Sequence, residues 1–435
     1  MTQLLDSLNQ QLQYVAASSV FYRDRLAEVG LAGGARSMVQ FLEAPPLMNK
    51  EIERESLDAS AERFGHPFGL HLCADPRNLY SVMTTSGTTG PPTWYLFTRD
   101  DWRRGLAADR RALRFAGVRR GDTAIYVFAA GSYIATLHVD AMRQMGVTTF
   151  EAGAHLAPER LAEMCERLHP SVILGTPTTM FAILDTGWRP APEHPIRTII
   201  CGGEPAAAIP RVRERLESGF SGTVRDIFGP VSGNMFMSCD APSYSGLHFL
   251  SPESGLGPID LHSPLNRAHI PMGPGAEGEL YYTALRHEAA PLIKYASGDM
   301  VRVDPSPCAC GSSAPRVNFR GRVADMVAVG AARVGPWHVR EAAAELSALS
   351  SNIRLVQPRL KSPALHVLAE ASGDLRAAKA DARRLETTLA ARFRISVEVI
   401  PVPPGTLPGG APKTALTLSE EDADALLAYL ARKET

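Results

Sequence analysis

The chain has 435 residues, and at roughly 150 residues per domain this length favours two or three domains with a large buried core. Lys and Arg total 45 and Asp and Glu total 46, so the net charge of −1 argues against nucleic acid or an anionic membrane surface as the main partner. The composition excludes disorder, no apolar run could span a bilayer, six cysteines do not make a disulfide scaffold, and the N-terminus carries no secretory signal, so we expect a cytoplasmic enzyme.

Hydrophobic spacing predicts the elements in chain order. Residues 3–30 carry leucines three and four positions apart, which predicts an amphipathic helix, and residues 37–66 predict short helices interrupted at Pro45. Between about 78 and 230, short apolar runs alternate with helical stretches, a pattern typical of βαβ units and a largely parallel sheet. Residues 245–320 are rich in strand-like runs separated by glycine and proline.

A second unit follows, with strand-like runs and two helical segments at 336–349 and 375–393, which suffice for a small α+β domain. The predicted fold class is therefore α/β. A large N-terminal domain with mostly parallel sheets and a β-rich subdomain spans 1–324, and a small α+β C-terminal domain spans 325–435.

The strongest local signal is the segment TTSGTTGPPT at residues 84–93, which we call the phosphate loop. Gly87 and Gly90 let the backbone approach a ligand closely, and successive N–H groups there can form a nest for anions. Threonine and serine hydroxyls add donors, which suits a polyphosphate. No Gly-Lys-Ser/Thr follows, so this is not a Walker A loop, and the alternative is an ordinary surface turn.

A second constellation is built from cysteine. Cys308 and Cys310 are separated by one residue, too close for an easy unstrained disulfide. Together with Cys239 and His248 they offer three thiolates and an imidazole, a set that suits a closed, structural tetrahedral Zn²⁺ site. The alternative is two exposed thiols and an unrelated buried pair. The other three cysteines lie in apolar contexts and are expected in the core.

The phosphate loop resembles that of the adenylate-forming superfamily of acyl-CoA synthetases and adenylation domains, and further motifs follow in the same order. GGEP at 202–205 is similar to the adenine-binding turn, DIFG at 226–229 to the motif whose aromatic residue stacks near the nucleotide, and YASGD at 295–299 to the ribose-binding segment. The flanking segments SSVFYRDRL, PPLMNKEI and CACGSSAPR resemble the phenylacetate–coenzyme A ligase group.

This resemblance implies roles for individual residues. Asp299 would hold the ribose hydroxyls, Lys413 would be the catalytic lysine, and Asp325 would be the hinge about which a mobile C-terminal domain rotates. The residues expected to contact ATP are Thr85, Ser86, Gly87, Thr89, Gly90, Gly203, Glu204, Pro205, Asp226, Phe228, Gly229, Asp299 and Arg322.

The sequence departs from the family pattern at three places. Ser232 stands where a magnesium-binding Glu is usual, so Mg²⁺ would be held by the phosphates, Thr88 and water, and Lys413, Thr88 and Ser232 form the expected catalytic set. Pro91 stands where the phosphate loop commonly has a Lys. The segment 329–334 lacks the usual Arg-Gly hairpin that lines the pantetheine tunnel.

The resemblance implies an ATP-dependent ligase that converts an aromatic carboxylic acid into an acyl-adenylate and then into a coenzyme A thioester. Tyr133 and His138 are candidate contacts to the aryl group, with ordinary packing as the alternative. Because of Ser232 and the altered hairpin, two other functions stay open. One is adenylation with a carrier protein, an amine or another acceptor, or of a non-carboxylate oxyanion, and the other is nucleotide binding without catalysis. A homodimer is the candidate assembly.

Overall fold

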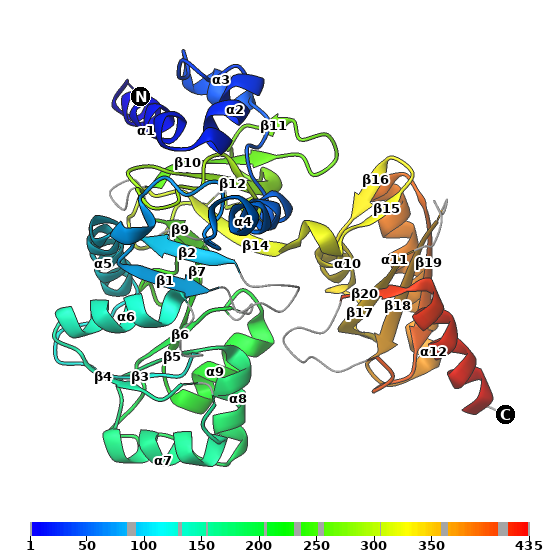
Figure 1. Cartoon of the computed structure of the whole chain (residues 1–435). Helices are drawn as coiled ribbons and strands as arrows, with labels where there is room; N and C mark the ends of the chain where they lie inside the picture. Colours follow the sequence, from blue (N-terminus) through cyan, green and yellow to red (C-terminus); the bar gives the residue numbers. More distant parts are fainter. Residues whose placement is uncertain are drawn as a thin grey trace. The chain divides into compact units, whose positions relative to one another are not determined.

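The computed structural model describes residues 2–84, 93–128, 133–153, 155–203, 207–229, 236–250, 256–304, 306–357, 364–407 and 416–433. Contacts divide the chain into two units, Met1–Phe319 and Arg320–Thr435 (Figure 1). The domain boundary that the sequence places after residue 324 stays a prediction. Within the described residues, none of the helices combines the length and apolar character that crossing a bilayer requires.

The first unit begins with four helices. They are α1 (Thr2–Ser18), α2 (Val20–Glu28), α3 (Met38–Glu43) and α4 (Lys50–Phe64). The prediction of one helix over residues 3–30 is wrong, because Ser19 has an extended backbone and its hydroxyl donates to the carbonyl of Leu70 at 2.8 Å. α4 begins at Asn49, whose side chain accepts the Ile52 N–H at 2.9 Å, and ends at Gly65 in the left-handed region.

The next elements form a two-stranded antiparallel hairpin and a doubly wound sheet. The hairpin strands β1 (Ser81–Thr84) and β2 (Trp94–Phe97) flank the phosphate loop. In the sheet, neighbouring strands pair in parallel in the order β4-β3-β5-β6-β7. The elements are α5 (Arg99–Phe115), β3 (Thr123–Tyr126), α6 (Tyr133–Gln144), β4 (Thr148–Glu151), α7 (Pro158–Leu168), β5 (Val172–Gly175), α8 (Pro177–Asp185), β6 (Thr198–Cys201), α9 (Pro210–Phe220) and β7 (Thr223–Phe228).

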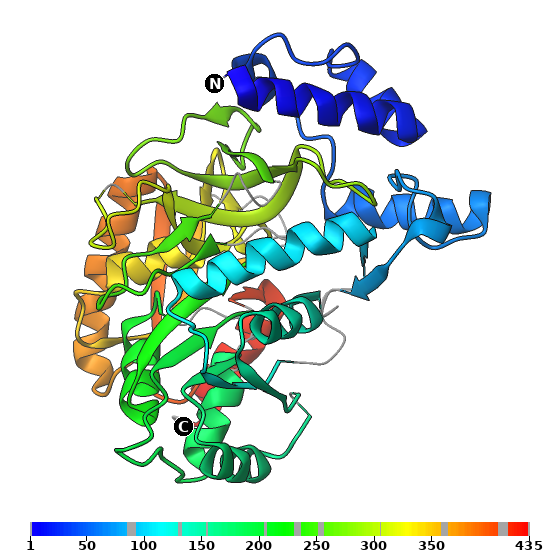
Figure 2. The ribbon, with the colours of Figure 1, turned by 90° about the vertical axis from the view of Figure 1, so that its left-hand side faces the viewer.

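Helices cover both faces of these parallel strands, and each face has its own apolar core. On one face α5 and α6 bury residues such as Leu113 and Leu137 against the strands. On the other face α7, α8 and α9 bury Leu161, Ile183 and Phe220. Figure 2 shows α5 in cyan in front of the green strands. Because both faces are buried, the strands read as nearly continuous apolar runs, as βαβ units require.

The same sheet continues beyond β7 with antiparallel strands, so that one sheet has twelve strands in the order β11-β10-β12-β13-β14-β9-β8-β7-β6-β5-β3-β4. The predicted change from parallel, helix-covered strands to a β-rich subdomain is confirmed as a change of pairing within one sheet. The added strands are β8 (Phe236–Met237), β9 (Leu247–Phe249), β10 (Leu256–His262), β11 (His269–Ile270), β12 (Glu277–Ala284), β13 (Tyr295–Val303) and β14 (Arg316–Arg322).

The second unit is an α+β fold around its own core. It contains the hairpin β15-β16 and a four-stranded sheet in the order β19-β18-β17-β20. A third helix, α12, was not predicted, and α10 ends before the predicted residue 349. The elements are β15 (Val327–Val329), β16 (Ala332–Val334), α10 (Pro336–Ala343), β17 (Leu349–Gln357), β18 (Ala364–Ala371), α11 (Leu375–Phe393), β19 (Ser396–Val402), β20 (Thr417–Ser419) and α12 (Glu420–Lys433).

Candidate nucleotide-binding site

Many of the predicted site residues lie outside the described part of the chain, and their predictions stand untested. Tyr133 begins α6, but its side chain is also outside the description. The predicted site residues outside it are Thr85, Ser86, Gly87, Thr88, Thr89, Gly90, Glu204, Pro205, Ser232 and Lys413.

Four of the described site residues, Gly203, Asp226, Phe228 and Gly229, lie at or near the carboxyl ends of β6 and β7, where open α/β sheets bind ligands. The register pairs Cys201 of β6 with Asp226 of β7, so Gly203 and Phe228 both lie at this edge. Gly203 has φ +76°, a conformation that glycine adopts at little cost. Phe228 is half-buried and its ring lies 5.6 Å from Phe236, so the strand end carries a fixed aromatic surface.

Asp226 is buried, and its observed partners are backbone groups. Its two carboxylate oxygens accept the N–H groups of Ala207 at 2.9 Å and Ala208 at 3.3 Å. Burial raises the pKa of Asp226 to about 7, although these two donors oppose the shift. The side chain therefore fixes the start of the segment that leads to α9. A direct contact of Asp226 with ATP stays a prediction.

Asp299 lies inside β13. The register between β12 and β13 shifts between Glu279 and Tyr281, so the Ser-Gly step before Asp299 is an irregularity of the ladder. Gly298 has φ +75° and donates its N–H to the Glu279 carboxylate at 3.0 Å. The irregularity changes the direction of the strand at the residue predicted to hold ribose, and Asp299 itself is buried.

A polar cluster next to the phosphate loop was missed by the sequence analysis. Lys50, the first residue of α4, donates to the hydroxyl of Thr93, the last residue of the loop. Glu53, one turn along the helix, lies 3.3 Å from the Lys50 ammonium and accepts the Tyr295 hydroxyl at 3.0 Å. Lys50 belongs to the PPLMNKEI segment that carried part of the family resemblance. No local sequence pattern predicts its contact with Thr93, which lies 43 residues further along the chain.

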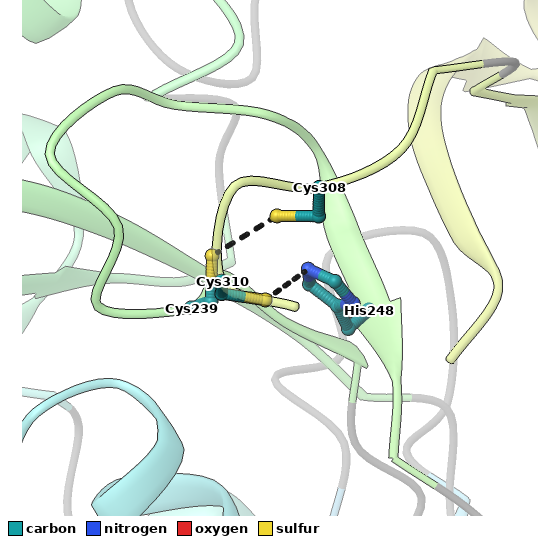
Figure 3. Close-up of side chains that lie close together, drawn as sticks. All are labelled: Cys239, His248, Cys308 and Cys310. Atoms are coloured by element: carbon teal, nitrogen blue, oxygen red, sulfur yellow. Dashed lines mark hydrogen bonds between the residues drawn. The ribbon is translucent and has the colours of Figure 1, made fainter. Parts of the chain in front are cut away.

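The four predicted metal ligands come together (Figure 3). Their ligand atoms all lie within 4.8 Å of one another. The sulfurs of Cys239 and Cys308 are 3.6 Å apart, and the Cys310 sulfur is 3.6 Å from Nε2 of His248. Burial raises the pKa of Cys308, but hydrogen bonds from Ser245 and neighbouring groups outweigh it and hold this pKa near 7. The arrangement can offer sulfur and nitrogen donors to a soft metal ion.

His138 packs inside the fold. It lies on α6 with 2% of its surface exposed, and its Nδ1 is 3.4 Å from a carboxylate oxygen of Asp109 on α5. Burial raises the pKa of Asp109 to about 6, and the nearby imidazole opposes this shift. The observed contact supports the packing alternative for His138, and its contact with an aryl group stays a prediction.

The two remaining predicted residues, Arg322 and Asp325, belong to the second unit. Arg322 ends β14, and Asp325 lies in the short 3₁₀ helix Val323–Asp325 that follows. Burial raises the pKa of Asp325, while the neighbouring Arg322 opposes the shift. The hinge role of Asp325 stays a prediction.

Comparisons with known proteins agree with this arrangement. A phenylacetate-coenzyme A ligase of Pseudomonas putida is 26% identical over 361 residues, which are 80% of this chain and 76% of that protein. One of Aromatoleum evansii is 27% identical over 290 residues, 64% of this chain and 62% of that protein. A solved 2-hydroxyisobutyryl-CoA ligase in the postadenylation state, in complex with 2-HIB-AMP, aligns over 99% of this chain and 92% of its own, with a TM-score of 0.78 and 22% identity, and so shares the fold. The family of AMP-binding enzymes matches residues 5–282, well over half of the chain, and the chain therefore belongs to this family.

Proposed function

We propose that the chain is an ATP-dependent, AMP-forming ligase that joins an aromatic carboxylic acid to coenzyme A. The observation that carries the proposal is the membership of the AMP-binding enzyme family together with two relatives named phenylacetate-coenzyme A ligase. The placement of Phe228 and Gly203 at the carboxyl edge of the sheet, where a nucleotide would bind, supports it.

The proposed reaction has two steps. A carboxylate oxygen attacks the α-phosphorus of ATP, the acyl-adenylate forms and pyrophosphate leaves. The sulfur of coenzyme A then attacks the acyl carbonyl carbon, the thioester forms and AMP leaves as the thiol proton is released. Positioning and electrostatic stabilisation dominate such chemistry. We propose that Lys413 neutralises charge in the first step and that Thr88 and Ser232 complete the catalytic set. Mg²⁺, when bound, would be held by the phosphates, Thr88 and water and would offset the negative charge of the phosphates.

Pyrophosphate release across a panel of acids tests the proposal. Phenylacetate and benzoate should release pyrophosphate with ATP faster than 2-hydroxyisobutyrate, and mass spectrometry should find AMP and the aryl thioester when coenzyme A is present. Lys413→Ala should slow adenylate formation by orders of magnitude yet still turn synthetic acyl-adenylate into thioester. Lys379→Ala, an exposed lysine on α11 of the same unit, is the matched control and should leave both steps unchanged.

Ser232 and the altered 329–334 hairpin favour a second candidate, in which the acceptor is a carrier protein, an amine or another nucleophile. Pyrophosphate release without any coenzyme A thioester would support that acceptor change. Tight ATP binding with no release on any acid would support a nucleotide-binding protein without catalysis. The homodimer and the cytoplasmic location stay predictions from sequence.

We also propose that Cys239, His248, Cys308 and Cys310 hold a structural Zn²⁺. Ligand atoms on a tetrahedral zinc lie about 3.3–3.8 Å apart, and the two measured separations of 3.6 Å fall in this range. Three thiolates and an imidazole leave no open coordination position, so the ion would stabilise the first unit. Freshly purified, reduced protein should contain about one zinc per chain. Cys308→Ser should lose zinc and lower the unfolding temperature, whereas Cys73→Ser, outside the cluster, should keep it.

A further inference from the structure

The phosphate loop contains no charged residue. Between Thr84 and Thr93 the sequence offers hydroxyls, backbone N–H groups and two prolines, and neither Lys nor Arg. A bound triphosphate carries several negative charges, and neutral donors alone leave much of that charge uncompensated. A cation is therefore expected from another part of the chain.

Lys50 is placed at the end of this loop by α4. Its ammonium donates to the hydroxyl of Thr93, which is itself fully buried, while the lysine side chain keeps 37% of its surface exposed. Glu53 lies 3.3 Å from the ammonium, and this ion pair limits the positions that the ammonium adopts. The loop end thus has a half-exposed, ion-paired cation at its side.

The segment before α4 is anchored to the strand that carries the predicted ribose residue. Leu47 donates its N–H to the carbonyl of Lys294 at 3.1 Å, and Ala296 donates to the carbonyl of Met48 at 2.9 Å. This short parallel pairing fixes the start of α4 beside β13, three residues before Asp299. Glu53 continues the link through its hydrogen bond from the Tyr295 hydroxyl. One helical turn therefore connects the phosphate loop with the YASGD strand.

A comparison of Lys50 with a fully buried lysine, Lys294, separates a structural role from a ligand-binding role. Lys294 has no exposed surface, and its ammonium is bound by Asp260 at 2.6 Å and by the carbonyl of Leu42 at 2.6 Å. That lysine is enclosed on the inside of the fold. The Lys50 side chain, by contrast, has 37% of its surface exposed and contacts Thr93 at the end of the phosphate loop. A cation that binds a substrate needs such exposure.

We propose that Lys50 supplies the positive charge of the polyphosphate site, in place of the lysine that the phosphate loop lacks. The proposal rests on the proposed function, because it takes the triphosphate of ATP as the ligand. Lys50 pairs with the phosphates that are absent from AMP, and Glu53 and Tyr295 position it. Lys50 is then a substrate-binding residue that lies in the PPLMNKEI segment, outside the motifs predicted to contact the nucleotide.

The test compares ATP with AMP. Lys50→Met should weaken ATP binding by about tenfold to a hundredfold, measured by isothermal titration calorimetry, and should change AMP binding less than twofold. Lys50→Arg keeps the charge and should recover most of the ATP affinity. Arg63→Met removes an exposed positive charge from the far end of the same helix and is the matched control, with both affinities unchanged. The unfolding midpoint of each variant reports whether the fold is kept.

Each outcome of this test supports or overturns the proposed role of Lys50. Equal loss of ATP and AMP affinity in Lys50→Met would make Lys50 a structural residue and overturn the inference, and so would ATP affinity equal to that of the parent. If Lys50→Met does not fold, Lys50→Gln takes its place: weakened ATP binding with unchanged AMP binding supports the inference, and unchanged binding of both overturns it. A parent chain that binds no ATP would remove the proposed function and the inference with it. If the parent chain binds ATP but the Lys50 variants contradict the inference, only the inference fails and the proposed function stands.

Discussion

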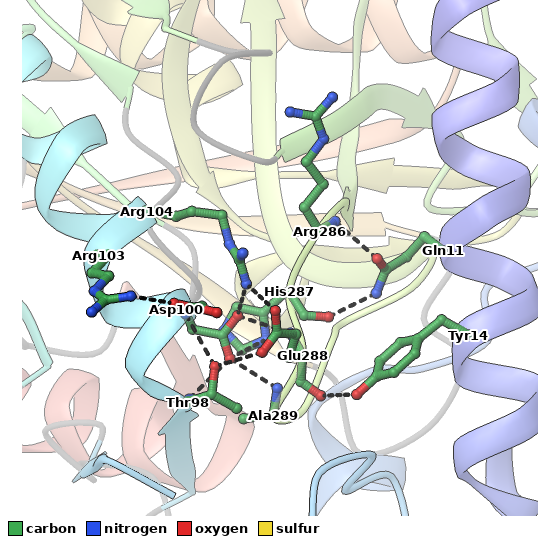
Figure 4. A network of polar contacts seen from close by, with 11 residues as sticks. Gln11, Tyr14, Thr98, Asp100, Arg103, Arg104, Arg286, His287, Glu288 and Ala289 are labelled. Carbon is green, nitrogen blue, oxygen red and sulfur yellow. Dashed lines mark hydrogen bonds and ion pairs between the residues drawn. The ribbon is translucent and has the colours of Figure 1, made fainter. Parts of the chain in front are cut away.

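Asp101 and Glu53 are both almost fully buried beside a cation, but their environments differ. Asp101 accepts backbone N–H groups from Thr98, Glu288 and Ala289 at 2.8–3.0 Å and also pairs with Arg104. Figure 4 labels these four partners. Glu53 contacts side chains, Lys50 and Tyr295, at the edge of the phosphate loop. A carboxylate bound by backbone groups holds the fold together, whereas Glu53 joins two side chains and so links α4 to β13.

The Asp101 network also explains how the N-terminal helix is held. The segment 286–289 links Asp101 to α1: Glu288 and Ala289 donate their N–H groups to Asp101. Gln11 of α1 accepts the Arg286 N–H and donates to the His287 carbonyl, both at 2.8 Å (Figure 4). Burial raises the pKa of Asp101, but the nearby His287, the backbone donors Thr98 and Ala289 and the Arg104 side chain outweigh it, so this pKa lies below its usual range. The stability that Asp101 contributes is thus present at neutral pH and is lost as pH falls through that lowered pKa.

The largest expected effect comes from Asp101→Ala. The substitution leaves three backbone N–H groups without their acceptor and removes one of the two carboxylate partners of Arg104, and we expect a loss of about 3–5 kcal/mol in the free energy of unfolding. Asp100→Ala is the matched control, since Asp100 is exposed and pairs with Arg103 at the surface, and it should cost less than about 1 kcal/mol. Denaturant unfolding measures both. Equal losses would break the distinction between the two kinds of carboxylate.

The next effect concerns binding rather than stability. Asp299→Ala should weaken ATP affinity by about 1.5–3 kcal/mol, the range for hydrogen bonds to a charged group, because the ribose hydroxyls lose their acceptor. Asp226→Ala should mainly lower the free energy of unfolding, since its observed partners are backbone N–H groups. Calorimetric ATP titration and denaturant unfolding of both variants check this. The reverse result, with Asp226 controlling ATP affinity, would show that the ribose residue is misassigned.

Sequence reasoning found what local patterns encode. The βαβ alternation in 78–230 is visible because apolar strands and helical stretches each bury their own residues. The cluster of Cys239, His248, Cys308 and Cys310 was predicted because three thiolates and an imidazole suit tetrahedral zinc. α12 was missed although Leu426, Leu427 and Leu430 have helical spacing and pack on the core of the second unit. The break at Ser19 depends on the carbonyl of Leu70, which lies far along the chain.

For the candidate site, too, the sequence predicted motif residues but not the tertiary contacts around them. Motif order placed Asp299 on the ribose segment, but the irregular ladder that presents it depends on pairing with β12. The Lys50–Thr93 contact joins two segments that share no pattern, so only the folded chain reveals it. Residues that act through tertiary contacts are thus the part of a site that a single sequence hides.

A third kind of carboxylate sharpens the comparison: within the described residues Asp109 accepts no hydrogen bond from a backbone group or an arginine, and His138 is its charged neighbour when protonated. Asp109 has a pKa raised by burial to about 6, above the value of an unfolded chain. The folded state therefore binds the proton more tightly, and its stability falls as pH rises from about 4 to about 6. Asp109→Asn should remove this fall, worth on the order of 2 kcal/mol at pH 7. The difference in unfolding free energy between variant and parent, measured at pH 4.5 and pH 7, should grow with pH; a constant difference would contradict it.

The smallest expected effect separates two buried tyrosines. Tyr295 donates its hydroxyl to Glu53, so Tyr295→Phe leaves a buried carboxylate with one donor fewer and should cost about 1.5 kcal/mol of unfolding free energy. It should also raise the KM for ATP a few-fold, because Lys50 loses part of its support. Tyr126 is equally buried, but its hydroxyl has no hydrogen-bond partner within the described residues. Tyr126→Phe removes an unsatisfied polar group and should be neutral or slightly stabilising, with the KM for ATP unchanged. If the two variants lose the same stability, the Glu53 contact adds nothing beyond ordinary packing, and the link from α4 to the YASGD strand is carried by the backbone pairing at Met48 alone.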